Sequence, residues 1–193
     1  MGGKQGVMGA IGRLLVRGSS ALSLLGLLVQ PTAAVAGTVP DDGTVWSTAV
    51  ARHAENDRAI VYRYISALPA TVSRQAFPVR IILVWRYDSA SGMPQTAERE
   101  RMDQMEDLLA PAVESSGLAR LLMVSTGENL REWTYYTRDE EAFMTALNQA
   151  LAEQPAFPLQ IHIAPDPDWH SYESFRQGVV VSDIPEAQGD STP

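Results

Sequence analysis

The sequence contains no cysteine and only one lysine, Lys4. The lack of cysteine excludes disulfide bonds, thiol catalysis, cysteine-ligated zinc and iron–sulfur clusters. Beyond Lys4 the chain can form neither a phosphate-binding P-loop nor a Ser-x-x-Lys catalytic motif, because both require a lysine. Gly-x-Ser-x-Gly and Gly-x-Gly-x-x-Gly motifs are also absent. The common sequence signatures of nucleophilic catalysis and phosphate binding are therefore missing.

No apolar run in the chain reaches the roughly 20 residues that a membrane-spanning helix needs. The N-terminus instead shows the three parts of a secretory signal: a positively charged start without acids, the short apolar run 21–29, and Ala34-Val35-Ala36 before Gly37. The alternative is an uncleaved N-terminal helix or a weak anchor. We expect residues 1–36 to be a cleavable signal peptide, which places the protein in the periplasm or outside the cell with no stable membrane span.

Basic residues are scarce in the remainder of the chain. Without residues 1–36 it keeps 12 arginines and all 23 acidic residues, so its formal charge is −11, against −8 for the whole sequence. A charge of this sign repels nucleic acid and anionic lipid, so neither is expected as a partner. The length suffices for one domain with a core, at 37–176. Residues 177–193 lack periodicity and are expected to form a flexible tail.

Hydrophobic periodicity predicts an α+β fold. Strands are expected at 46–52, 58–65, 79–87, 118–125, 130–137 and 159–163, and helices at 94–114 and 137–152, the second starting at a capping box formed by Thr137 and Glu140. From Val79 onward this order is the ferredoxin-like βαββαβ arrangement, an antiparallel sheet with helices on one face, preceded by an extra N-terminal β-hairpin. Pro111 should kink or end the first helix. Residues 165–176 form a polar, aromatic closing segment.

Three segments in the second half carry a family resemblance. They are the aromatic strand 131–137 (REWTYYT), the helix with Phe143-x-x-x-Leu147-Asn148, and Asp166-Pro167-Asp168-Trp169-x-x-Tyr172. In this order they resemble the bacterial domain of unknown function 695 family, most specifically over 118–172. The resemblance implies a fold but no established activity. The layout is also similar to the family of regulators of ribonuclease E activity B, small acidic proteins that bind another protein. An exported chain would not meet ribonuclease E.

Asp166, Asp168 and His170 gather two carboxylates and an imidazole within five positions. In a functional interpretation they bind a divalent cation or place an acid beside a base. In a structural interpretation Asp166 caps a turn while Trp169 and Tyr172 pack over the end of the sheet. A zinc or similar site needs more ligands, and no second histidine lies at helical spacing. No metal and no cofactor are therefore expected.

Aromatic and arginine side chains are the candidates for binding a ligand or partner. Trp133, Tyr135 and Tyr136 could line a cleft, although alternation sends Tyr136 to the face opposite the other two and favours core packing for most of these rings. If the sheet face opposite the helices is open, Tyr136 could form a binding surface there with Arg80 and Arg86. Trp169 and Tyr172 are two further candidates.

Three functions remain open for the domain. The first is a non-enzymatic protein- or ligand-binding or regulatory module of the cell envelope, which the missing catalytic motifs favour. The alternative is a hydrolase that uses a carboxylate near Asp166 and Asp168, since the spacing of paired carboxylates is spatial and leaves no sequence signature. A third is a ligand-binding domain with a small cleft between the N-terminal hairpin and the sheet.

Overall fold

The computed structural model describes residues 43–179, which form a mixed α and β domain. Its strands are β1 (Val45–Arg52), β2 (Ala59–Ala67), β3 (Val79–Arg86), β4 (Ala119–Gly127), β5 (Leu130–Thr137) and β6 (Leu159–Pro165), and its helices are α1 (Thr96–Leu109), α2 (Glu140–Leu151) and α3 (His170–Gly178). The predicted signal peptide lies outside the described residues. None of these helices combines the length and apolar character needed to cross a bilayer.

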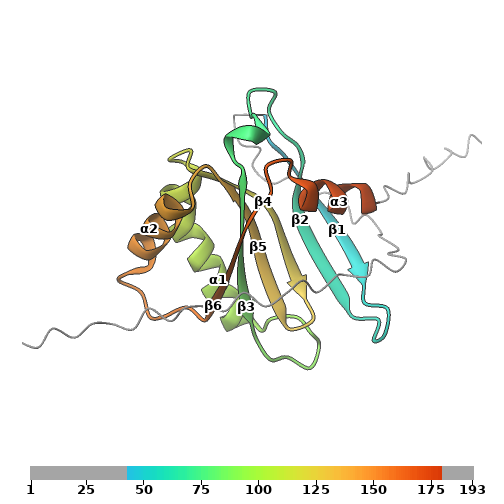
Figure 1. Ribbon diagram of the computed structural model, residues 1–193. Coiled ribbons are helices and arrows are strands. Elements are labelled where there is room, and N and C mark those ends of the chain that lie inside the picture. The colour runs from blue at the N-terminus through green and yellow to red at the C-terminus, as the bar shows by residue number, and fades with distance from the viewer. Residues whose placement is uncertain (1–42, 180–193) are drawn as a thin grey trace, which may run out of the picture.

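The six strands form one antiparallel sheet in the order β1-β2-β4-β5-β3-β6 (Figure 1). Within the described residues, β1 and β6 are therefore the two edge strands. Gly127, at the end of β4, lies so close to β2 that a Cβ atom there would sit 2.6 Å from the carbonyl oxygen of Ala59. Glycine is required at this point because any side chain would push β2 away from β4.

The main hydrophobic core lies between the sheet and helices α1 and α2. It contains the inward residues of β3, as alternation predicts, and the stripe of α1 that repeats at helical spacing. Fully buried members from these elements and from β5 and α2 are Ile81, Leu83, Trp85, Met102, Met105, Leu109, Trp133, Tyr135 and Phe143. The inward residues of β6 pack against the same core. The core residues therefore follow the alternation of the strands and the helical spacing of α1.

Helix α1 changes its winding near Pro111. Residues Ala110–Glu114 form a π-helical turn, in which the amide of Ser115 donates to the carbonyl oxygen of Ala110 at 3.0 Å. Proline has no amide hydrogen to continue the α-helical pattern, so the chain adopts the wider turn before it leaves the helix. The prediction that Pro111 would kink or end the helix is confirmed. The predicted helix 94–114 is instead an α-helix that begins at Thr96 and continues into this π-helical turn.

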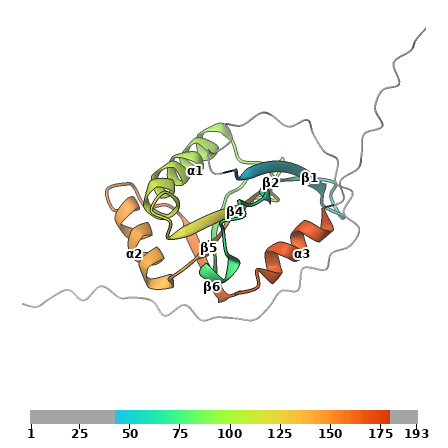
Figure 2. The same ribbon diagram turned by 90° about the horizontal axis from the view of Figure 1, so that it is seen from above.

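Helix α3 lies on the opposite face of the sheet from α1 and α2 (Figure 2). It belongs to a second cluster of buried residues, which joins Trp169 and Tyr172 to Ile65, Leu122 and Tyr136 of three strands. The prediction of helices on one face therefore holds for α1 and α2 only. The sequence did not predict α3, because segment 165–176 is short and has few apolar side chains to show a helical period. The helix is stabilised by packing on strands that are distant in sequence.

Two predicted boundaries are corrected at the helix ends. The cap of α2 is Asp139, whose side chain accepts a hydrogen bond from the amide of Ala142 at 2.7 Å. Thr137, the predicted cap, instead donates to backbone oxygens of Leu118 and Asp139, so it closes the turn before the helix. At the other end α3 extends to Gly178, two residues into the segment predicted as a tail. The rest of that segment, from residue 180, is outside the described residues.

Candidate functional site

Asp166 is the best-connected carboxylate on the face that carries α3. It is buried, and it accepts hydrogen bonds from the Tyr136 hydroxyl at 2.7 Å and from the amides of His170 at 2.7 Å and Ser171 at 3.1 Å. Burial alone would raise the pKa of Asp166, but these hydrogen bonds outweigh it and hold the pKa below its ordinary value. Both carboxylate oxygens are therefore committed to holding the first turn of α3.

The aromatic rings near Asp166 pack against one another. Trp169 has no exposed surface, its indole N–H donates to the carbonyl oxygen of Phe77 at 2.9 Å, and its ring centroid lies 4.7 Å from that of Tyr136. Tyr172 is 2% exposed and its hydroxyl donates to the carbonyl oxygen of Ile65. Three of the predicted binding residues, Tyr136, Trp169 and Tyr172, thus occupy the interior and fix α3 to the sheet.

The other candidates lie at different places. Trp133 is buried in the core beneath α1, on the side of the sheet away from Tyr136. Asp168 and His170 are both exposed, so they do not share the enclosed environment of Asp166. Arg80 donates a hydrogen bond to the hydroxyl of Ser171 in α3. Alternation in β3 places Arg86 on the same face of the sheet as Arg80. Arg86 is exposed, and it is the one predicted binding residue that is open to solvent on this face.

A polar group, of which only Arg86 was among the predicted site residues, lies on this same face. Strand register places Tyr62, Ser125, Glu132 and Val84 in one row across β2, β4, β5 and β3. The hydroxyl of Ser125 donates to Oε2 of Glu132 at 3.4 Å, a long hydrogen bond. We call the group of Tyr62, Ser125, Glu132, His162 and Arg86 the Glu132 group; its last two members stand in the neighbouring rows.

The electrostatics of the Glu132 group show that its carboxylate lacks full compensation. Burial raises the pKa of Glu132 above its ordinary value, and the Ser125 hydrogen bond with the nearby His162 and Arg86 offsets only part of that rise. Burial, and then the charge of Glu132, also raise the pKa of the Tyr62 hydroxyl, which therefore remains a neutral donor. A half-buried carboxylate with a single long hydrogen bond is suited to accept donors from a ligand.

The sequence did not predict Glu132 as a site residue, because the aromatic residues around it in β5 indicate core packing. Alternation places Glu132 on the same face of β5 as Tyr136, because an even number of positions separates the two residues. The available signal for Glu132 was its charge, since a charged residue in the middle of a buried strand is unusual. The partners Tyr62 and Ser125 come from strands far away in sequence, and only the register brings them together.

The opposite face holds a second polar network, beneath α1. Glu106 accepts a hydrogen bond from the Trp133 indole at 2.8 Å and pairs with Arg63 and Arg131. Arg131 also pairs with Asp103 at 2.8 Å. Each charge has a partner of opposite sign on a neighbouring element, so this network ties α1 to β2 and β5 and leaves little capacity for a ligand.

Glu114 and Tyr135 lie at the end of that network. Burial raises the pKa of Glu114 to about 7, and the amide of Leu121, which donates to it at 3.4 Å, offsets the rise only in part. The hydroxyl of Tyr135 is buried and has no hydrogen-bond partner in the part of the chain that the structure describes. Burial followed by the charges of Glu114 and Glu106 places the pKa of Tyr135 well above its ordinary value, so its hydroxyl stays neutral.

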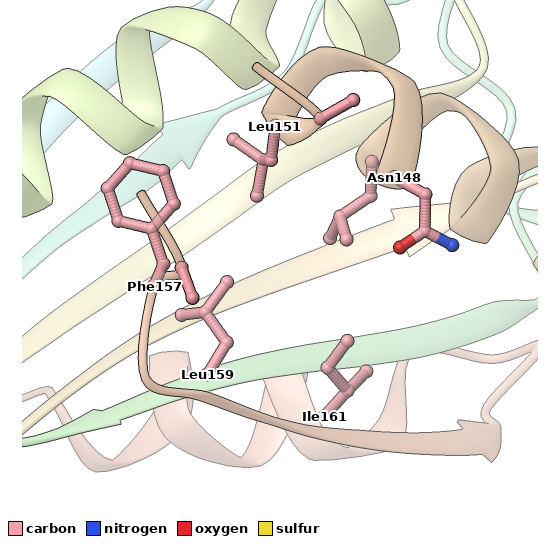
Figure 3. Close-up of a pocket in the computed structure, with 8 residues that line it drawn as sticks. Asn148, Leu151, Phe157, Leu159 and Ile161 are labelled. Carbon is pink, nitrogen blue, oxygen red and sulfur yellow. The ribbon is translucent and has the colours of Figure 1, made fainter. Parts of the chain in front are cut away.

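An apolar pocket of about 300 Å³ opens between α2 and β6 (Figure 3). Leu151 of α2 faces Phe157, Leu159 and Ile161 across it, and Asn148 lies at its rim. Ligand sites usually combine an apolar lining with several convergent polar groups that orient the ligand. Asn148 is the one polar side chain in this lining, so the pocket lacks such a set. The Glu132 group is therefore the better candidate for recognition.

Within residues 43–179 no group of three or more His, Asp or Glu side chains is arranged to hold a metal ion.

Comparison with known proteins identifies one family, described as a family of unknown function, DUF695, which matches residues 45–176. The chain belongs to the DUF695 family. No curated protein matches the chain. The family match spans every strand of the sheet and most of α3, so the Asp166 network and the Glu132 group both fall inside the family domain.

Proposed function

We propose that this DUF695 protein is an exported, non-enzymatic binding protein of the cell envelope that holds a polar ligand or partner group on the Glu132 group. The observation that carries the proposal is the half-buried Glu132 carboxylate, which has one long hydrogen bond at 3.4 Å and stands on the sheet face that carries α3. The export part rests on the N-terminal pattern of residues 1–36.

The fold supports a binding role through its layout. We infer a ferredoxin-like arrangement for the part from β3 to β6, because the order β6-β3-β5-β4 puts β5 between the strands joined by α1 and puts β3 between those joined by α2. The antiparallel pair of β1 and β2 then extends this sheet as an added hairpin. The extension places Tyr62 beside Ser125 and so completes the Glu132 group.

The geometry at Asp166 argues against the alternative of a carboxylate-dependent hydrolase. A general base must have a free lone pair directed at its substrate. The two oxygens of Asp166 already accept three hydrogen bonds from Tyr136, His170 and Ser171. Asp168 is exposed, and the structure gives it no partner that would activate it among the described residues.

The test compares capture of envelope components by the purified protein and by two charge reversals. Glu132→Arg alters the proposed site, and Glu100→Arg makes the same change at an exposed position on α1, across the sheet. We expect a molecule bound stoichiometrically by the wild type, identified by native mass spectrometry, to be retained by the Glu100 variant and lost by the Glu132 variant. Circular dichroism shows whether both variants are folded.

Two results would contradict the proposal. The first is equal retention of the bound molecule by the wild type and the folded Glu132→Arg variant, which would move the site elsewhere. The second is turnover in a substrate screen that disappears in a folded Asp168→Ala variant, which would establish the hydrolase instead.

A further inference from the structure

We infer that the Glu132 group binds a small zwitterion of the amino-acid type, with the ammonium at Glu132 and the carboxylate at Arg86. This inference rests on the proposed function and names its ligand class. The first step is the carboxylate. Among residues 43–179, Oε2 of Glu132 has only the long Ser125 hydrogen bond, and an ammonium group can supply three short, charge-assisted donors.

The second step is the cation on the same face. Arg86 pairs with Leu130 in the register, and Glu132 pairs with Val84, so the two charged residues stand diagonally on adjacent strands. They influence each other electrostatically, yet within the described residues they form no ion pair with each other. Each therefore keeps hydrogen-bonding capacity for one end of a ligand that lies between them.

The third step is the surface between and around the charges. Val84 lies directly beside Glu132, and Ile82 occupies the next position of the same face of β3. On the other side the ring of Tyr62 packs against Phe175 of α3, with centroids 5.0 Å apart. Val84 is only 3% exposed and forms the floor of this surface. The half-buried side chain of Ile82 and the ring of Tyr62 would contact an aliphatic side chain, while the hydroxyls of Tyr62 and Ser125 provide neutral polar contacts.

A set of three probes with one side chain tests the two charges separately. L-leucine carries both charges, N-acetyl-L-leucine lacks the ammonium, and L-leucinamide lacks the carboxylate. Each is titrated into the isotope-labelled protein, and amide chemical shifts report affinity and location. We expect L-leucine to bind at least about tenfold more tightly than either analogue, as the loss of one charge-assisted hydrogen-bonded group implies. The shifts should concentrate on amides of β3, β4 and β5 near Glu132.

Variants then assign each charge to its residue. Glu132→Gln should remove the preference for L-leucine over N-acetyl-L-leucine, and Arg86→Gln the preference for L-leucine over L-leucinamide. Glu100→Gln and Arg99→Gln, on exposed positions of α1, are the matched controls and should keep both preferences.

The inference is overturned if the three probes bind equally, if none shifts any amide at millimolar concentration, or if the shifts map to another face. It is also overturned if each substitution leaves the preferences unchanged. Should an envelope component bind in a Glu132-dependent manner while L-leucine does not, the zwitterion is wrong and the proposed function stands. Should the captured component ignore Glu132→Arg, the proposed function fails as well.

Discussion

At the scale of single residues, the environment of each carboxyl group decides what it can do. Asp166 and Glu132 lie on the same face of the sheet, but Asp166 accepts three hydrogen bonds and Glu132 accepts one long one. The pKa of Asp166 is accordingly lowered and that of Glu132 is raised. The first is a structural residue, and the second has unused capacity for recognition.

Asp166 provides a test of the structural role. Asp166→Ala removes three hydrogen bonds that include charged and buried partners, so the free energy of unfolding should fall by about 2 to 4 kcal/mol in urea titrations. Asp168→Ala alters an exposed carboxylate two positions away and should change it by less than about 0.5 kcal/mol. Equal effects of the two substitutions would contradict the network described for Asp166.

Glu114 predicts a pH dependence of stability. Its pKa rises from 4.5 to about 7 on folding, mainly through burial. Between these two values the folded state holds more protons at Glu114 than the unfolded state. The contribution of Glu114 to stability is therefore fully present below pH 4.5 and is lost as the pH rises toward 7. Glu114→Gln should remove this loss and raise the free energy of unfolding above pH 7 by about 1 to 3 kcal/mol, allowing for its partial exposure.

The control for that measurement is Glu141→Gln, at an exposed position of α2. Its urea unfolding curves, recorded from pH 5 to 8, should change with pH in parallel with those of the wild type. A Glu114→Gln variant that also follows the wild-type profile would show that Glu114 is ionised in the folded state at neutral pH.

At the scale of elements, α3 depends on the sheet for its existence. It spans 9 residues, which is shorter than an isolated helix needs for stability in water. Trp169, its N-cap, has φ of 56°, a left-handed conformation that bulky residues rarely adopt. This conformation is stabilised because the buried indole packs on Tyr136 and donates to Phe77.

Trp169→Ala should therefore release α3. We expect a loss of about 3 to 5 kcal/mol in the free energy of unfolding, as for other large-to-small core substitutions. In native-state hydrogen exchange the amides of α3 should exchange rapidly while those of β3 and β5 remain protected. Trp133→Ala, on the other face, should destabilise the whole domain without singling out α3. Protected α3 amides in a folded Trp169→Ala protein would contradict this account.

At the scale of the whole molecule, the two faces of the sheet differ in how far helices cover them. Helices α1 and α2 cover one face and enclose the main core, while α3 covers part of the other face. The Glu132 group lies on that second face beside α3, which it meets where Tyr62 packs against Phe175. The family domain that spans residues 45–176 contains all of these parts, so the proposed binding site and the two buried clusters share one sheet.

The predicted export also belongs to this scale. A mature protein recovered from the envelope should begin at Gly37, as read by N-terminal sequencing, because small residues precede that position. Leu25→Arg would put a charge into the apolar run 21–29 and should keep the full-length chain inside the cell. Recovery of an intact N-terminus from the envelope would instead favour the uncleaved helix or weak anchor.

Local patterns in the sequence were sufficient for much of the fold. The strand positions, the buried faces of β3, β6 and α1, and the effect of Pro111 follow from periodicity and from the chemistry of proline, which act over neighbouring residues. The family was recognisable for the same reason, since its characteristic residues stand close together between 118 and 172. Structure that depends on neighbouring residues, such as the buried face of one helix or strand, can therefore be predicted from the sequence of that element.

Only the tertiary structure decided which face α3 occupies and which polar groups meet there. The sequence around Asp166 is compatible with a catalytic carboxylate and with a structural one. The long-range hydrogen bond from Tyr136, together with the local amides of His170 and Ser171, assigns it the structural role. In the sequence, Glu132 is a single charged residue within an aromatic strand. The strand register places it beside Ser125 and near Tyr62. Pairing between distant strands is fixed by packing over the whole sheet, so no short segment of the sequence carries it.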